Sequence, residues 1–205
     1  MGKTWIFDLD NTLHDAQKKI FPLINKKINQ YISEVVKINL SEADVLRQKY
    51  WDNYGATLEG LIKHHNINPK DFLKKTHTLK HFEELVFPMQ DLIKVLSSIS
   101  GGKIIYTNAP RDYTNKVLKI CKIEDYFDEI FSIEDCNFLA KPSVTSMEFF
   151  LKKYEIKEAI FVDDVKENLE TANQFGLSTI WLTNAKENPS YIDKKISKLK
   201  DLISD

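Results

Sequence analysis

The sequence predicts an α/β protein built on a doubly wound parallel sheet, with an all-helical segment inserted after the first strand. Short runs rich in Ile, Phe and Val recur along the chain with few polar residues, as in parallel strands covered on both faces. Helical patterns separate the later runs, and this alternation is typical of a doubly wound sheet. Residues 15–87, which follow the first run, contain only helical patterns.

Five strands and the helices between them are expected from hydrophobic periodicity. Residues 189–204 place Ile192, Ile196, Leu199 and Ile203 on one face, which predicts a closing helix packed on the core, with a partner-binding helix as the alternative. The expected strands are 4–8, 103–107, 129–133, 159–163 and 178–182. The expected helices of the sheet are 89–99, 112–121, 143–154 and 166–175, the last ending before Gly176.

The helical segment interrupts the α/β pattern directly after the first strand. We expect a core domain formed by residues 1–14 and 88–205 and a helical cap formed by residues 15–87. The expected cap helices are 21–37, 41–54, 57–66 and 69–76, with starts at Ser41-Glu42 and Asn68-Pro69. Its place in the chain makes the segment a candidate lid over the end of the first strand, and a purely structural subdomain is the alternative.

Composition excludes several classes of protein. The chain has 205 residues, of which 42% are hydrophobic, enough for one core and a sizeable insertion. A formal net charge of −1 argues against binding a nucleic acid polymer or an anionic membrane by bulk charge. No apolar run approaches the ~18 residues of a membrane span, and no signal peptide is expected. Cys121 and Cys136 fit reduced thiols in a cytoplasmic protein.

The most informative stretch is WIFDLDNT at residues 5–12, where an apolar strand stops at Asp8 and Asp10. Ligands bind at the carboxyl ends of strands in open α/β sheets, so these residues indicate a site. Three other polar groups follow later strands: Thr107-Asn108, Lys141, and Asp163-Asp164. A doubly wound sheet brings all four loops to one edge. Singly, the residues also fit turns, helix caps or a surface lysine.

Carboxylates gathered in this way need a cation or protons. At ~4 Å and an effective dielectric near 20, each like-charged pair costs about 4 kcal/mol. Oxygen ligands suit Mg²⁺, which takes one or two carboxylates plus a substrate phosphate. Lys141 and the Thr107 hydroxyl suit an anion, so a phosphate would meet the metal on one side and these groups on the other.

Other ligand chemistries fit less well. A calcium loop starting at Asp8 would need Gly and Glu where Leu13 and Lys19 stand. The chain has neither GxxxxGK[ST] nor GxGxxG. The sequence does not decide whether Asn168 is an ordinary helix residue or part of the site. The histidines are expected to be solvent-facing, with substrate contact as the alternative for His14, His77 and His81, and a metal site as the alternative for His64-His65.

These motifs resemble those of the haloacid dehalogenase (HAD) superfamily. DLDNT at 8–12 is similar to the first motif, YTN at 106–108 to the second, Lys141-Pro142 to the third, and VDD at 162–164 with Asn168 to the fourth. They occur in the family's order and span most of the chain. The insertion stands where helical-cap members carry their cap, and residues 50–77 look like the cap of pyrimidine 5′-nucleotidases.

The resemblance implies a Rossmann-like core and a role for each motif residue. Asp8 would be the nucleophile that forms an aspartyl-phosphate, and Asp10 the general acid and base. Lys141 would neutralise Asp8. The implied phosphate-binding residues are Leu9, Thr107, Asn108 and Lys141. The implied Mg²⁺ ligands are Asp8, the Asp10 carbonyl and Asp164, with Asp163 acting directly or through water.

The implied activity is hydrolysis of a small phosphate monoester. Carbon–halogen cleaving members lack an acidic residue where Asp10 stands, and ATPases carry Thr there. The expected enzyme is a Mg²⁺-dependent pyrimidine 5′-nucleotidase acting on UMP or CMP, in a cytoplasmic monomer or homodimer. A sugar-phosphate phosphatase or phosphomutase is the alternative within the superfamily. A non-catalytic phosphate sensor is the alternative of another class, because receiver domains also combine carboxylates, Thr and Lys.

Overall fold

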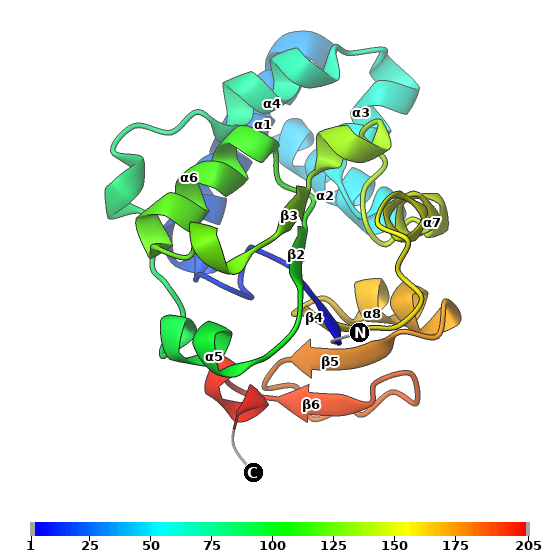
Figure 1. Ribbon diagram of the computed structural model, residues 1–205. Coiled ribbons are helices and arrows are strands. Elements are labelled where there is room, and N and C mark those ends of the chain that lie inside the picture. The colour runs from blue at the N-terminus through cyan, green and yellow to red at the C-terminus, as the bar shows by residue number, and fades with distance from the viewer. Residues whose placement is uncertain (1–2, 204–205) are drawn as a thin grey trace.

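A six-stranded parallel sheet organises the computed structural model, which describes residues 3–203 (Figure 1). The strand order is β3-β2-β1-β4-β5-β6, so the chain winds outward from β1 in both directions. The strands are β1 Thr4–Phe7, β2 Lys103–Tyr106, β3 Glu129–Phe131, β4 Ala159–Asp163, β5 Ser178–Leu182 and β6 Lys194–Ile196. The predicted doubly wound parallel sheet is confirmed.

The central strands end level with one another. Phe7 lies opposite Ile105 of β2 on one side and opposite Val162 of β4 on the other. All residues of β2 and β4 are buried, as continuous apolar runs predict for strands covered on both faces. The loops after β1, β2 and β4 therefore start at the same edge of the sheet.

Helices cover both faces of the sheet (Figure 1). Alternate strand residues point to opposite faces, so Phe7 and Ile105 join a core with α5 Leu92–Ser98 and α6 Arg111–Cys121. Ile6 and Phe161 join a second core with α7 Val144–Lys153 and α8 Lys166–Gln174. Short 3-10 helices are Phe82–Glu84 (η1), Glu124–Tyr126 (η2), Ile133–Cys136 (η3) and Leu199–Leu202 (η4).

The insertion after β1 is all-helical, and Figure 1 shows it gathered beside one edge of the sheet. Two of its helix starts have a clear cause. Asn39 and Glu42 form a capping box, and the Asn68 side chain accepts from the backbone N–H groups of Lys70 and Asp71. The four helices are α1 Ala16–Val36, α2 Leu40–Tyr54, α3 Thr57–His65 and α4 Pro69–His77. The helical cap is confirmed, and its exact limits as a domain stay a prediction.

The predicted closing helix at 189–204 is wrong. This segment instead contains β6 and η4. The edge of β5 offers unpaired backbone groups, and β6 pairs with it along Ile180 to Leu182. The apolar residues whose spacing indicated one face of a helix instead pack on the two faces of the sheet. Ile192 packs in the core with α7 and α8, and Leu199 packs in the core with α5 and α6.

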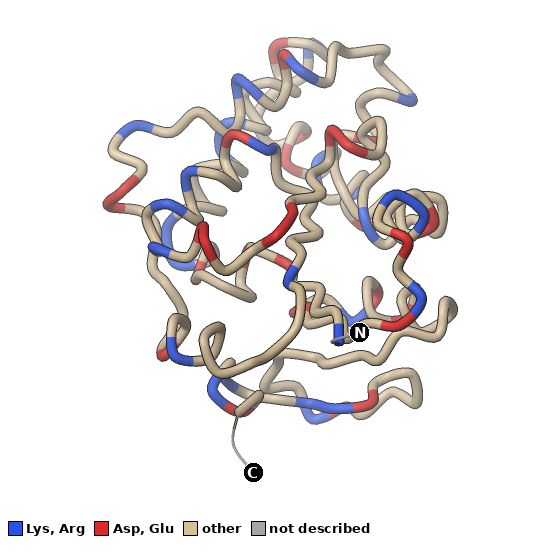
Figure 2. The backbone as a smooth tube through the Cα atoms, viewed as in Figure 1, with Lys and Arg blue, Asp and Glu red and all other residues tan. Residues whose placement is uncertain are grey.

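Charges of both signs are interspersed over the molecule (Figure 2). The 29 Lys and Arg residues nearly balance the 30 Asp and Glu residues of the chain. Within residues 3–203, no helix combines the length and apolar character needed to cross a membrane.

Gly55, the residue that ends α2, brings the cap against the core. Its φ is +75°, and a Cβ built there would lie 2.3 Å from the Lys141 carbonyl oxygen and 2.5 Å from Pro142 Cδ. Only glycine fits both the left-handed backbone and this approach. The α2–α3 turn therefore rests directly on the loop that carries Lys141.

We expect Gly55→Ala to destabilise the protein by about 1–3 kcal/mol more than Gly176→Ala, because it adds overpacking to the backbone strain that both share. Gly176 is the matched control, since its φ is +76° and a Cβ built there would have no other atom within 4 Å. Urea unfolding of the two variants measures the difference. Equal losses would contradict a close cap–core contact at Gly55.

Candidate active site

Three carboxylates meet where β1 and β4 end. Asp8 directly follows β1, Asp163 is the last residue of β4, and Asp164 follows it. Each offers an oxygen within 4.8 Å of the others. Among the described residues this is the cluster of carboxylate, His or Cys ligands that could hold a metal ion. The sheet thus brings together residues that lie more than half the chain apart in sequence.

One ammonium group bridges two of these carboxylates. Lys141 Nζ donates to Asp8 Oδ1 at 2.8 Å and to Asp163 Oδ2 at 2.7 Å, and the lysine is 2% exposed. Burial alone would lower the pKa of Lys141, but Asp163 and Asp8 raise it above its usual value. The lysine therefore stays charged.

The backbone of Lys141 is fixed by Asn108, which follows β2. Asn108 Oδ1 accepts from the Lys141 N–H at 2.7 Å, and its Nδ2 donates to the Lys141 carbonyl at 3.0 Å. Both ends of the amide are therefore engaged with the loop. Asn108 lines the cavity as well, but its contacts show a positioning role, and phosphate binding by this residue stays a prediction.

Asp163 and Asp164 differ in how their oxygens are occupied. Asp163 is fully buried and accepts from Asn168 Nδ2, from the Val165 N–H and from Lys141. Asp164 is partly exposed and lines the cavity, with an electrostatic contact from the Asn11 side chain. Asn168, which the sequence left open, thus orients Asp163, and Asp164 is the carboxylate that remains more available for a ligand.

The cluster carries more negative charge than Lys141 balances. Burial raises the pKa of Asp8 to about 7, with Lys141 opposing and Asp163 adding to the shift. Burial, Asp163 and Asp8 raise the pKa of Asp164 to about 8. A hard divalent cation fits this set, because the free donors are carboxylate oxygens and a second cation would remove the repulsion.

Thr107 offers its hydroxyl to the cavity, whereas Leu9 can offer only its main chain. The Thr107 N–H donates to the Phe131 carbonyl at 3.0 Å, and its hydroxyl accepts from the Ala109 N–H at 3.0 Å. The hydroxyl is thus oriented at the cavity wall, with its proton free to donate. The Leu9 side chain is fully buried, so only its main chain can face a ligand.

Asp10 has two partners: Tyr113, which the sequence did not single out, and His14, which it offered only as an alternative substrate contact. Tyr113 OH donates to Asp10 Oδ1 at 2.6 Å, and His14 Nε2 lies 2.7 Å from the same oxygen. The expectation of a solvent-facing His14 is wrong, because this ring is fully buried. Two signals were available: His14 stands four residues after Asp10, and Tyr113 lies in the first turn of the helix after β2.

A cavity of about 410 Å³ joins these groups to the cap. Its floor holds the carboxylates and Lys141, and its roof comes from the inserted helices. The polar residues of the roof include Gln17, Asn25, Arg47, Gln48 and His77, and the apolar ones include Phe21, Ile24, Trp51, Phe72 and Leu73. A volume of this size suits a small molecule of metabolite size.

The other histidines take different positions. His77 lines the cavity, against the expectation of a surface residue, and burial lowers its pKa to about 4. His81 is exposed, as expected. His64 and His65 lie by the hydroxyls of Tyr54 and Tyr50 rather than in a ligand cluster.

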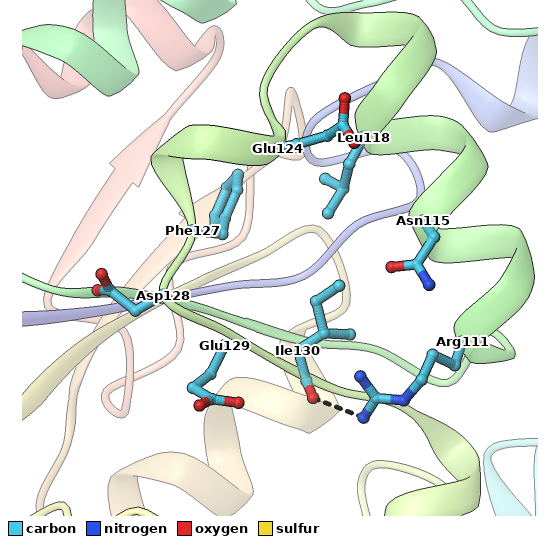
Figure 3. A pocket seen from close by; sticks show the side chains of 8 residues that line it. All are labelled: Arg111, Asn115, Leu118, Glu124, Phe127, Asp128, Glu129 and Ile130. Atoms are coloured by element: carbon cyan, nitrogen blue, oxygen red, sulfur yellow. Dashed lines mark hydrogen bonds between the residues drawn. The ribbon is translucent and has the colours of Figure 1, made fainter.

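A second hollow, of about 300 Å³, lies between α6 and β3 and contains none of the predicted site residues (Figure 3). Arg111 lines it and donates to the Ile130 carbonyl at 2.8 Å, while acidic Glu124, Asp128 and Glu129 surround the rest. Its one cation is already committed to backbone and to Asp135, so this hollow lacks the groups for the predicted chemistry.

Comparisons with known proteins agree with this geometry. A family model described as haloacid dehalogenase-like hydrolase matches residues 5–182. Phosphate metabolism protein 8 of Saccharomyces cerevisiae (strain ATCC 204508 / S288c) is 25% identical over 195 residues, which cover 87% of this chain. The chain spans about 60% of the length of that curated relative.

Solved structures share the fold at low identity. A HAD phosphatase from Thermococcus onnurineus superposes with a TM-score of 0.68 at 19% identity, covering 98% of this chain and 96% of that one. The putative HAD-hydrolase YfnB from Bacillus subtilis, bound to magnesium, gives 0.63 at 18%, covering 98% and 96%. L-2-haloacid dehalogenase from Xanthobacter autotrophicus gives 0.63 at 15%, covering 98% and 97%.

The raised carboxyl pKa values predict how stability depends on pH without metal. The pKa values of Asp8 and Asp164 rise from 3.8 to about 7 and about 8. At pH values between 3.8 and these raised values, the folded state therefore binds more protons than the unfolded chain. Their contribution is present at low pH and is lost as pH rises through that range. We therefore expect a falling melting temperature from about pH 5 to about pH 8 in EDTA, and a weaker fall in Asp164→Asn.

Glu170→Gln on the exposed face of α8 is the control for removing one carboxylate. It should keep the wild-type slope of melting temperature against pH. An Asp164→Asn slope equal to that of the wild type would show that this carboxylate is not part of an overcharged cluster.

Proposed function

The chain belongs to the haloacid dehalogenase-like hydrolases, and on that premise we propose that it is a Mg²⁺-dependent phosphomonoesterase. The observation that carries the proposal is Asp10, which lines the same cavity as Asp8 two residues earlier. A halide leaves as a stable anion and needs no acid, whereas an alkoxide leaving from phosphorus needs a proton. A carboxylic acid at this position therefore favours an ester over a carbon–halogen bond.

The floor of the cavity suits attack on phosphorus. An Asp8 oxygen attacks in line, the bond from phosphorus to the ester oxygen breaks, and Asp10 gives that oxygen its proton. Asp10 then takes a proton from the water that hydrolyses the aspartyl-phosphate. Lys141 offsets the charge of Asp8 as the phosphate approaches, and Asp163 and Asn108 hold the lysine in place.

Mg²⁺ held by Asp8, the Asp10 carbonyl and Asp164, with Asp163 direct or through water, would neutralise the charge that develops on the phosphoryl oxygens. The Thr107 hydroxyl and the main-chain N–H of Leu9 are the proposed additional donors to those oxygens. The fit of the metal rests on the three gathered carboxylates and on the raised pKa values of Asp8 and Asp164.

We further propose a pyrimidine nucleoside monophosphate as the preferred substrate, with residues 15–87 as a cap domain over the core of residues 1–14 and 88–205. The roof of the cavity combines the aromatic residues Phe21 and Phe72 with the amide residues Asn25 and Gln48. Such a wall suits a flat base with polar edges. The name of the yeast relative points to phosphate metabolism and no further. A cytoplasmic location and a monomeric or homodimeric state stay predictions.

Phosphate release with Mg²⁺ tests the activity across UMP, CMP, AMP, GMP, sugar phosphates and phosphoglycolate. We expect UMP or CMP to lead by kcat/KM and Asp8→Asn to lower kcat by at least ~10⁴-fold, because it removes the nucleophile. Asp135→Asn, which changes a carboxylate on η3 bound to Arg111, is the control for the same substitution elsewhere.

The outcomes separate the rival functions. Turnover led by a sugar phosphate would keep the mechanism and contradict the nucleotide substrate, and turnover that needs a bisphosphate activator would indicate a phosphomutase. No release from any ester by protein that binds Mg²⁺ would contradict the enzyme and favour a phosphate sensor.

A further inference from the structure

Both polar groups that contact Asp10 converge on one of its two oxygens. Tyr113 OH donates to Oδ1 at 2.6 Å, and His14 Nε2 lies 2.7 Å from Oδ1. Within residues 3–203, Oδ2 has no hydrogen-bond partner. We propose that His14 and Tyr113 are positioning residues that occupy Oδ1, so that Oδ2 alone exchanges a proton with the ester oxygen. This inference rests on the proposed phosphatase function.

The tautomer of His14 follows from its surroundings. Its Nδ1 is buried and lacks a partner among the described residues. With the proton on Nδ1, that buried donor would be unpaired and the lone pair of Nε2 would face the Asp10 oxygen, which can only accept. The ring therefore carries its proton on Nε2 and donates to Asp10. Tyr113 also donates, so Oδ1 receives two donors, the usual capacity of one carboxylate oxygen.

Both donors are held rigidly. The His14 carbonyl accepts from the Asn11 N–H at 2.8 Å, which closes the loop that carries Asp10. The Tyr113 ring lies edge-on to Phe82 at 5.3 Å and to His77, at the end of α4, at 5.8 Å. The Asp10 side chain keeps 17% of its surface exposed, although both donors are buried. The exposed part of the Asp10 side chain therefore faces the cavity.

The consequence for the reaction concerns which atom carries the proton. With Oδ1 saturated, the proton that Asp10 transfers sits on Oδ2. As the bond from Asp8 to phosphorus forms and the bond to the ester oxygen breaks, the Oδ2 proton passes to that oxygen. In the second step, Oδ2 takes back a proton from the attacking water. A loosened Asp10 would rotate and lose this alignment, while Asp8 and Lys141 would be unchanged.

Leaving-group dependence separates this role from a structural one. p-Nitrophenol leaves as a stable anion and needs little help from an acid, whereas an alkyl alcohol needs a proton. The ratio kcat/KM reports steps up to release of the leaving group, so it excludes the later water attack. We expect Tyr113→Phe and His14→Leu to lower kcat/KM by on the order of 10–100-fold for an alkyl phosphate and by less than about threefold for p-nitrophenyl phosphate.

Two further variants control the test. His14→Gln keeps an N–H donor near the position of Nε2 and should restore part of the lost alkyl-phosphate activity. Tyr31→Phe removes the hydroxyl of another buried tyrosine, which lies against Phe72 in the cap and does not line the cavity, and should keep both activities. Melting temperatures of all variants establish that each one folds.

The outcomes are distinct from those of the proposed function. Equal losses on the two esters, or no loss on either, would overturn the positioning role while the phosphatase stands. A wild-type protein that hydrolyses neither ester would overturn the proposed function and this inference with it.

Discussion

The buried ammonium of Lys141 between Asp8 and Asp163 is the interaction on which the rest of the site depends. Removing a charge from water is costly, and this one is tolerated because two carboxylates compensate it. The carboxylates balance the charge of Lys141, but Lys141 does not balance theirs, because the cluster holds a third carboxylate, Asp164. The excess of carboxylates is what suits the cluster to a divalent cation.

The fold explains how a few residues from distant parts of the sequence form the candidate site. β1 lies between β2 and β4, so the loops that follow these three strands converge without any long-range bending of the chain. The insertion begins within the first of these loops, and its α2–α3 turn rests on the Lys141 loop through Gly55. The helices that would contact a leaving group are thus packed directly against the loop that carries Lys141.

The sheet and the motif residues could be predicted from the sequence because each depends on local patterns. Apolar runs located five strands, and the abrupt change to carboxylates after the first strand located the candidate site. The last segment could not be predicted in this way, since the spacing of Ile192, Ile196 and Leu199 fits a helix as well as an edge strand with its flanking turns. The partners of Asp10 were missed for another reason: the burial of His14 and the reach of Tyr113 depend on tertiary packing, and neither residue type is diagnostic by itself.

Calorimetric titration of the metal-free protein with Mg²⁺ at pH 7, in two buffers of different ionisation enthalpy, tests the charge-balance account most directly. We expect Mg²⁺ to bind and to release protons, because the pKa values of Asp8 and Asp164 lie near or above this pH. We expect Asp164→Asn to bind Mg²⁺ more weakly and to release fewer protons. Binding of the same strength with no buffer dependence in both proteins, or no binding to the wild type, would contradict the charge-balance account.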